Sequence, residues 1–543
     1  MRIVPSLVLI SLASTVSLAA CGVTRRSGFE EKANDPVLPG AETGFDNDGG
    51  PVTELDRDPV TCAEATQART YVGCDYWATV TGNVVPDIFD FAIVVSNSGA
   101  TAADVKVTGP NGVDIAVNVA PGTLEKVFLP WVPALKGGGL GGASSSEAFT
   151  SSIVAKKSAY HVVSSVPVVV YQFNPLEYAG KGGPSGKSWS GCPELSGPGT
   201  GCFSYTNDAS LLMPSTAWTG SYRVTGMHGS SSGGLFGKEG VLGTFAAITA
   251  SQDGTKVKLA LGANAKILAG SGIDAGNPGD VVEIMLDAGD IAQVVTEKGE
   301  EFDLSGSLVQ SDKPVQVISG TQCTNVPADK PACDHLEESV LPAEALGKKY
   351  VITTPTRPAG GSGFHVVRFV GNRDDTKLTY APSKPAGCPD TLAAGQVAQC
   401  NGPVGDDFIV TGTQEFGVTT FMVGSTMYET SPKAKGDPSQ TIFASTEQFR
   451  SGYLFLNPDD YDVSYAVVVG PEGALPVLDG ELLGDGKPLA EGFVVWRATV
   501  KTGAHTLTST LPVGLQAMGY GAFTSYQFPG GLNAKRIAPP PTK

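Results

Sequence analysis

The densest cluster of ionisable side chains in the sequence is Asp334-His335-Leu336-Glu337-Glu338, which directly follows Cys333. Carboxylates around an imidazole can hold a divalent cation or raise the histidine pKa for acid–base chemistry. Asp334, His335 and Glu338 are therefore the candidate metal ligands. Metal sites usually draw ligands from separated elements, however, and no H-E-x-x-H spacing is present. We expect no metal or other cofactor, and we expect His335 and Glu338 to bond to the backbone and to pin the cysteine loop to the strand that starts near Val340.

Two glycine-rich stretches formally match motifs of enzymes. Gly229-Ser230-Ser231-Ser232-Gly233 fits the nucleophile elbow of hydrolases but lacks the strand-to-helix context that exposes such a serine. The stretch from Gly180 to Ser188 resembles a phosphate-binding loop but misses its spacing by one residue. We interpret both as loops and predict no catalytic residues. A hydrolase with an unrecognised site is kept as an alternative.

Eight of the nine cysteines form four local pairs with long cysteine-free stretches between them. An even number with this clustering is typical of small disulfide loops in an oxidising compartment. Zinc binding is disfavoured, because no pair has the close spacing of a zinc knuckle and the few histidines are scattered. We predict the disulfides Cys62–Cys74, Cys192–Cys202, Cys323–Cys333 and Cys388–Cys400.

The ninth cysteine, Cys21, follows a segment typical of a secretion signal. Ile3 to Leu18 is an apolar run that is too short for a permanent membrane span. Leu18-Ala19-Ala20-Cys21 resembles the lipobox of bacterial lipoproteins, which implies removal of residues 1–20 and lipid attachment at Cys21. An ordinary secretory signal is the alternative. We expect an exported chain with a membrane as its partner through the lipid, and Gly22 favours the outer membrane or cell surface.

The composition indicates short strands and turns rather than helices. The 543 residues are 41% hydrophobic but only 17% charged, and they include 69 glycines and 38 prolines. The formal net charge of −17 argues against nucleic acid as a partner and against electrostatic adhesion to anionic lipid.

Both ends of the mature chain are expected to be flexible. Residues 21–59 have few clustered apolar side chains and cannot bury enough surface to order themselves, so we predict a polar tether there. The prolines of Ala538-Pro539-Pro540-Pro541 indicate a flexible C-terminus over residues 531–543. The β-rich region is expected over residues 60–530.

Two phrases recur within that region. The stretches Tyr160–Val170, Leu308–Val317 and Leu507–Leu515 share a proline between two β-branched runs, and Ile409–Val418 is a weaker copy without the proline. Each predicts strand, turn and strand, with the proline opening the second strand. A second phrase, Asp208 to Val224, is paralleled by Glu338 to Val351 and more loosely by Ser439 to Leu454.

These phrases predict an all-β region of about four tandem β-sandwich-like repeats of roughly 100 residues each. The repeats are expected near residues 60–175, 205–322, 335–425 and 438–528. A β-propeller-like arrangement is the alternative, since a four-stranded blade takes about 40 to 50 residues.

Several strings resemble a known family. They are Tyr171-Gln172-Phe173-Asn174-Pro175, Thr206 to Pro214, Cys323 to Pro327 and Cys333 to Glu338. They are similar to the IgGFc-binding protein N-terminal-domain family, in particular to its bacterial lipoprotein members, over roughly Val80 to Phe528. Ser339 to Pro342 departs from the family's glutamine-led string. The resemblance implies an extracellular, disulfide-containing, non-enzymatic recognition or adhesion module.

The preferred function is thus a surface-anchored lipoprotein that recognises an extracellular protein or glycan through loops or sheet edges. The alternatives are a structural component of the cell envelope and the hydrolase named above. The resemblance does not identify the ligand of this chain.

Overall fold

The computed structural model describes residues 57–139, 149–195, 198–199, 201–230, 241–331, 333–429 and 434–542. They belong to one compact unit, Val37–Lys543. The predicted signal, Cys21 and most of the predicted tether lie outside the described residues. The helices α1 (Cys62–Ala68) and α2 (Pro133–Lys136) are short, and no helix in the described ranges is long and apolar enough to cross a membrane.

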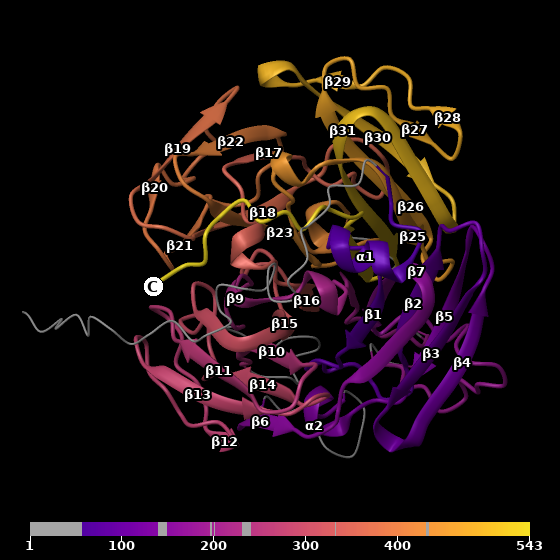
Figure 1. Cartoon of the computed structure of the whole chain (residues 1–543), viewed down its shortest axis with the longest axis vertical. Helices are drawn as coiled ribbons and strands as arrows, with labels where there is room; N and C mark the ends of the chain where they lie inside the picture. Colours follow the sequence, from indigo (N-terminus) through magenta and orange to yellow (C-terminus); the bar gives the residue numbers. More distant parts are fainter. Residues whose placement is uncertain are drawn as a thin grey trace, which may run out of the picture. The chain divides into compact units, whose positions relative to one another are not determined.

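The all-β fold class is confirmed, and the strands fall into four groups that follow one another around the centre of the view in Figure 1. The first group contains β1 (Gly73–Ala78), β2 (Phe91–Asn97), β3 (Ala103–Gly109), β4 (Val113–Val119), β5 (Thr123–Leu129), β7 (Tyr160–Asn174) and β8 (Asp208–Leu211). The second contains β9 (Thr219–Arg223), β10 (Thr244–Ala250), β11 (Thr255–Ala260), β12 (Gly270–Ser271), β13 (Val281–Leu286), β14 (Ile291–Val295), β15 (Leu308–Thr324) and β16 (Asp334–Ser339), together with β6 (Ser152–Ala155).

The other two groups repeat this succession. The third contains β17 (Lys349–Ile352), β18 (His365–Gly371), β19 (Thr376–Ala381), β20 (Thr391–Leu392), β21 (Val397–Gln399), β22 (Phe408–Gly412), β23 (Phe416–Met422) and β24 (Gln440–Ile442). The fourth contains β25 (Arg450–Asn457), β26 (Val463–Pro471), β27 (Val477–Leu478), β28 (Glu481–Leu482), β29 (Lys487–Pro488), β30 (Phe493–Val500), β31 (Gly503–Gly521) and β32 (Thr524–Pro529).

One pairing scheme recurs in the groups. The first half of β7 pairs with β1 and β3, and its second half pairs with β2 and β8. The strand β15 divides its partners in the same way, as does β31. In the first group, Val105 of β3 and Ile93 of β2 lie in the same buried core. The first, second and fourth groups are therefore two-sheet sandwiches whose long strand belongs to both sheets, whereas the third group has two separate four-stranded sheets.

The recurring proline marks the point where a long strand changes partners. The sequence predicts a turn there, but β7 and β15 run through Pro167 and Pro314 without interruption. Proline lacks an N–H group, and it is tolerated here because the ladder is already interrupted where the strand passes between sheets. In the first group, Ser164 Oγ donates to the carbonyl of Val166 at 2.7 Å beside this point. The third copy lacks the proline and is divided into β22 and β23.

We call β8, β16, β24 and β32 the inner strands. Each pairs with the second half of the long strand of its group, or with β23 in the third group. The strand β8 also packs against β16 and β32, and β24 packs against the same two. The four inner strands thus surround a common centre. The groups are sandwiches, as predicted. Their inner strands follow one another in a ring, which is what the propeller-like alternative predicts.

The C-terminal segment is not free in the structure, which corrects the expectation of a flexible terminus over residues 531–543. Leu532, Ala534 and Ala538 are buried. Asn533 forms a β-bridge with Thr70, so the end of the chain is held against the start of the first group. Small apolar side chains and free backbone groups allow this proline-rich segment to pack. Only Lys543 of the segment lies outside the described residues.

Candidate functional site

The centre formed by the inner strands carries a cluster of buried polar side chains. Asp208, Glu337, Gln440 and Gln527, one from each inner strand, are fully buried. A buried polar group destabilises the fold unless it is hydrogen-bonded. The contacts of this cluster therefore decide whether it can act on a ligand or serves to join the strand groups.

Asp208 connects three of the inner strands. Its Oδ2 accepts hydrogen bonds from the backbone N–H of Glu337 at 3.0 Å and of Gln440 at 2.9 Å. Its Oδ1 accepts one from Ser439 Oγ at 2.7 Å and one from the N–H of Ala209 at 2.9 Å. Burial raises the pKa of Asp208 well above its ordinary value, although these four donors favour the charged form. With its acceptor sites taken by protein donors, this carboxyl is a junction rather than a reactive group.

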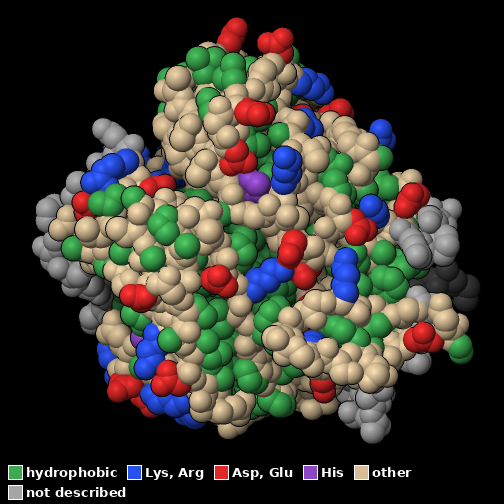
Figure 2. Space-filling model, turned by 90° about the vertical axis from the view of Figure 1, so that its right-hand side faces the viewer, with side chains coloured by type: hydrophobic (Ala, Val, Ile, Leu, Met, Phe, Trp, Pro, Cys, Tyr) green, Lys and Arg blue, Asp and Glu red, His purple; other side chains and the backbone are tan. Residues whose placement is uncertain are grey.

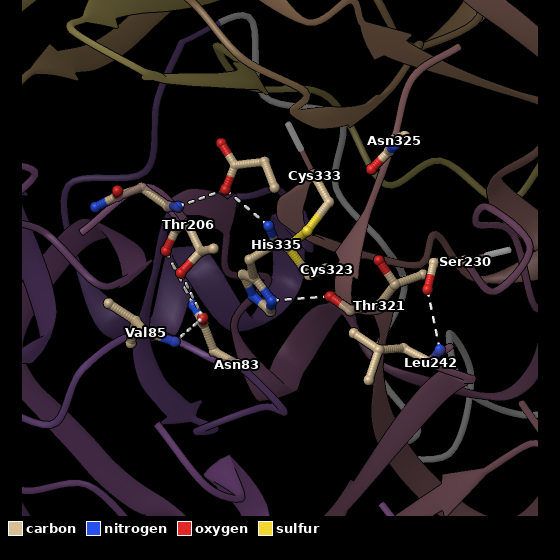
Figure 3. Close-up of a disulfide and its surroundings, with 12 residues drawn as sticks. Asn83, Val85, Thr206, Ser230, Leu242, Thr321, Cys323, Asn325, Cys333 and His335 are labelled. Carbon is tan, nitrogen blue, oxygen red and sulfur yellow. Dashed lines mark hydrogen bonds between the residues drawn. A yellow bond between two sulfur atoms is a disulfide. The ribbon is translucent and has the colours of Figure 1, made fainter. Parts of the chain in front are cut away.

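His335 and Glu337 join β16 to the first group. His335 Nδ1 contacts the carbonyl oxygen of Thr321 (Figure 3). The two atoms are 2.9 Å apart, and His335 Nε2 lies 3.2 Å from Asn174 Nδ2. Glu337 Oε2 accepts a hydrogen bond from Thr81 Oγ1 at 2.6 Å. These contacts fix the imidazole between two strand groups.

The three candidate metal ligands do not converge on one point. Side chains alternate between the faces of a strand, so His335 faces away from Asp334 and Glu338, and Leu336 separates those two along β16. Asp334 Oδ1 accepts from the N–H of Asn207 at 2.7 Å, and Glu338 Oε1 accepts from the N–H of Ser339 at 2.8 Å. Among the described residues, no set of three or more His, Cys, Asp or Glu side chains is placed to hold a metal ion.

The structure contains four disulfides, each within one of the local cysteine pairs. The Cα atoms are 5.7 Å apart in Cys62–Cys74 and in Cys192–Cys202, 5.2 Å apart in Cys323–Cys333, and 4.0 Å apart in Cys388–Cys400. Cys323–Cys333 closes the loop between β15 and β16, directly before Asp334 (Figure 3). This disulfide therefore fixes one edge of the central cluster.

The two glycine-rich motifs have structural contacts where they are described. Ser230 is buried, and its Oγ accepts a hydrogen bond from the N–H of Leu242 at 2.9 Å, while residues 231–233 lie outside the described ranges. In the other motif, Lys187 Nζ pairs with Glu177 Oε1 at 2.9 Å and lies 4.0 Å from the centre of the Trp189 ring. Burial raises the pKa of Glu177 to about 7. This lysine thus stabilises its own loop.

A cavity of about 460 Å³ lies between the second and third groups. Arg223, which is only 3% exposed, lines it together with Asn264 and Gln396. Arg223 Nη1 donates to the carbonyl of Gly306 at 3.0 Å, and burial lowers its pKa to about 10. Asp374 raises this pKa in turn, so an acidic side chain of the protein itself already lies near the guanidinium.

The outer edges of the sheets carry exposed apolar side chains. Val281 and Met285 are 57% and 52% exposed on β13, the last strand of its sheet, and Leu482 is 59% exposed on β28, another edge strand. On the face that Figure 2 shows, hydrophobic side chains lie in several groups between acidic and basic ones. An edge strand offers unpaired backbone groups to a partner.

The residues that organise the centre were only partly visible in the sequence. Asp208 begins the second recurring phrase, but its acceptor role depends on Glu337 and Gln440, which are far along the chain. No sequence motif marks Gln440 or Asp437. Their approach to Asp208 and Asp334 becomes apparent only when the inner strands are assembled.

The comparison with protein families matches residues 208–519 to the family described as IgGFc binding protein. The chain belongs to this family. The matched range starts at Asp208, the first residue of β8, and ends at Gly519 within β31. It contains the junction of Asp208 with Glu337 and Gln440. The expected resemblance began earlier, near Val80, but β1 to β7 precede the matched range.

A human relative of this family member is named IgGFc-binding protein. The two are 34% identical over 102 residues, which are 19% of this chain and 2% of the human protein. The chain therefore matches a very small share of that protein's length. What the human protein binds is not transferred by this similarity alone.

Proposed function

We propose that the chain is an exported lipoprotein, anchored through Cys21, that binds an extracellular protein. The observation that carries the proposal is the family membership over residues 208–519, since the family is named for binding IgG Fc. The four disulfides support it, because such bonds persist in oxidising compartments. The lipobox-like Leu18 to Cys21 supports the anchor.

The central cluster is an unsuitable contact surface, because Asp208, Glu337 and Gln440 are buried and Asp208 accepts hydrogen bonds from the backbone N–H groups of the other two. The outer edge of β13 is more suitable. A partner strand can add there through backbone hydrogen bonds, while Val281 and Met285 provide apolar contacts at alternate positions. We therefore assign partner binding to the edge of β13.

The test uses the full chain purified in detergent and immobilised through its C-terminus. Three probes are passed over it: purified IgG Fc, a glycan array, and solubilised cell-envelope protein before and after protease digestion. Saturable binding of Fc, or of an envelope component that digestion destroys, supports the proposal. Binding of glycans alone would show that the partner is a glycan rather than a protein. A null result with all three probes contradicts recognition as proposed.

The location of the contact is tested with matched variants. The double variant Val281→Lys/Met285→Lys places two charges on β13 and is expected to weaken binding by about tenfold or more. Leu482→Lys makes the same kind of change on the edge strand β28 and is expected to leave binding unchanged. If both variants bind as tightly as the native chain, the contact does not lie on β13.

A further inference from the structure

Two buried carboxylates at one edge of the central cluster have oxygens that no described residue satisfies, and Asp437 lies near enough to Asp334 to raise its pKa. Asp437, in the segment that leads to β24, is 1% exposed, and neither of its carboxylate oxygens has a hydrogen-bond partner. Asp334, at the start of β16, is fully buried, and its Oδ2 has no partner either. Leaving such groups without a counter-charge is costly, so the arrangement calls for a proton or a cation.

Two backbone carbonyl oxygens lie near Asp437, around Gly424. The position that a β-carbon on Gly424 would occupy lies 3.6 Å from Asp437 Oδ1 and 3.7 Å from the carbonyl oxygens of Val326 and Pro331. These oxygens come from the loop between β15 and β16 and from the segment after β23. They line a small space that the absence of a side chain at Gly424 keeps open.

Asn325 adds an amide oxygen to this loop. Its Nδ2 donates to the carbonyl of Lys330 at 2.7 Å, which orients the side chain, while its buried Oδ1 has no partner. Figure 3 shows Asn325 on the continuation of the strand that carries Thr321 and Cys323. The Cys323–Cys333 disulfide closes the loop that presents these oxygens.

The charges around the two carboxylates are mostly negative. Burial, Asp437 and Asp208 all raise the pKa of Asp334, and burial raises the pKa of Asp437. The lysines that are near in sequence pair elsewhere: Lys330 Nζ lies 3.0 Å from Asp329 Oδ2, and Lys435 Nζ lies 3.6 Å from Asp462 Oδ2. A bound cation would supply the missing positive charge.

We propose that Asp334 and Asp437, with the amide oxygen of Asn325 and the carbonyls of Val326 and Pro331, bind a calcium ion. The donors are all oxygens, and they come from irregular loops, which suits the variable coordination of Ca²⁺ better than the strict octahedron of Mg²⁺. A soft metal is disfavoured because His335 lies on the other face of β16 and both nearby cysteines are in a disulfide. The ion joins the second group to the third, independently of the binding partner.

The direct test is calcium binding by the full chain after treatment with a chelator. Isothermal titration is expected to show one saturable site with a Kd of about 10⁻⁴ M or lower, as in extracellular modules. Calcium is expected to raise the Tm, and magnesium at the same concentration to raise it less. Terbium, used in place of calcium, should luminesce when a nearby tyrosine is excited. Tyr461 is the expected donor, because its pKa is raised by burial and also by Asp334, which places it near that carboxylate. Absence of saturable calcium binding by the folded native chain would overturn the proposal.

Variants separate the site from calcium binding at the surface. Asp437→Asn is expected to weaken calcium binding by about tenfold or more, because one ligand charge is lost. Asp329→Asn, in the same loop but 73% exposed, serves as the control and should retain native affinity. Equal effects of the two variants, or no effect of Asp437→Asn, would contradict the assignment.

A second variant covers the case in which Asp437→Asn does not fold. Asn325→Asp adds a third carboxylate and is expected to tighten calcium binding while lowering the Tm in chelator. A purely structural role for Asn325 predicts a lower Tm with and without calcium and no gain in affinity. That result would show that Asn325 is not a calcium ligand. If the native chain also failed to bind calcium, the site itself would be ruled out.

Discussion

The hydroxyl of Tyr222 donates a hydrogen bond to the carbonyl of Val315 at 2.6 Å and accepts one from the N–H of Thr219 at 3.0 Å. The same bond recurs in the other groups. Tyr76 donates to Val168 at 2.6 Å, Tyr350 donates to Phe416 at 2.5 Å, and Tyr453 donates to Val513. In three groups the acceptor directly follows the proline of the long strand. One tyrosine thus holds the point at which the long strand changes partners in three groups, and it holds the start of β23 in the third group.

Tyr222→Phe is expected to lower the free energy of unfolding by about 1–3 kcal/mol, because the buried carbonyl of Val315 and N–H of Thr219 lose their partner. Denaturant titration measures the change. Tyr171→Phe is the matched control: Tyr171 is also fully buried, but its hydroxyl has no hydrogen-bond partner among the described residues. A change within about 0.5 kcal/mol is expected there. Equal losses in the two variants would show that the bond at Val315 is not the cause.

Glu344 should make the stability depend on pH. It is 1% exposed, and burial raises its pKa from 4.5 to about 7, while its Oε2 accepts a hydrogen bond from Thr219 Oγ1 at 3.0 Å. The folded chain therefore holds this proton more tightly than the unfolded chain does. The contribution of Glu344 to the free energy of unfolding therefore falls as the pH rises from 4.5 to about 7, and it stays at its lowest value above pH 7.

Glu344→Gln removes this titration. The difference in the free energy of unfolding between this variant and the native chain is expected to shift in favour of the variant by about 1–3 kcal/mol from pH 4.5 to pH 8. Denaturant titrations across that range measure the difference. Glu283→Gln, whose side chain is 75% exposed, provides the control and should leave the pH profile unchanged. A profile of Glu344→Gln that parallels the native one would contradict the prediction.

The sequence predicted the strands better than their assembly. The phrase around Pro167, Pro314 and Pro512 correctly located the long strands, because alternation and proline placement are local properties. It did not reveal that β7 continues through Pro167, since the neighbouring strands that exchange there are remote in sequence.

The central cluster was harder to predict for the same reason. Asp334, His335 and Glu338 were recognised as a cluster because they are adjacent in sequence, yet the strand separates them onto two faces. Asp437, which does approach Asp334, is about a hundred residues away in a segment without a motif. Contacts of this range depend on how the strand groups are packed, and periodicity carries no information about that.

The C-terminal segment is expected to be required for stability. Leu532 is 1% exposed within the largest buried core, so Leu532→Ala should lower the free energy of unfolding by about 2–4 kcal/mol. Leu482→Ala, at an exposed position of β28, should change it by less than about 0.5 kcal/mol. Thermal or denaturant unfolding checks both values. A neutral Leu532→Ala would restore the expectation of a flexible terminus.

The proposed lipid anchor can be tested through Cys21. Each buried methylene of an attached acyl chain contributes about 0.8 kcal/mol to membrane binding, so the acylated chain should stay in the membrane fraction through a salt wash. Cys21→Ser removes the attachment point and should abolish incorporation of a labelled fatty acid and release the chain from that fraction. Cys388→Ser, which removes a disulfide cysteine instead, should remain labelled and membrane-bound. Persistent labelling of Cys21→Ser, or its retention after the wash, would show that Cys21 is not the anchor.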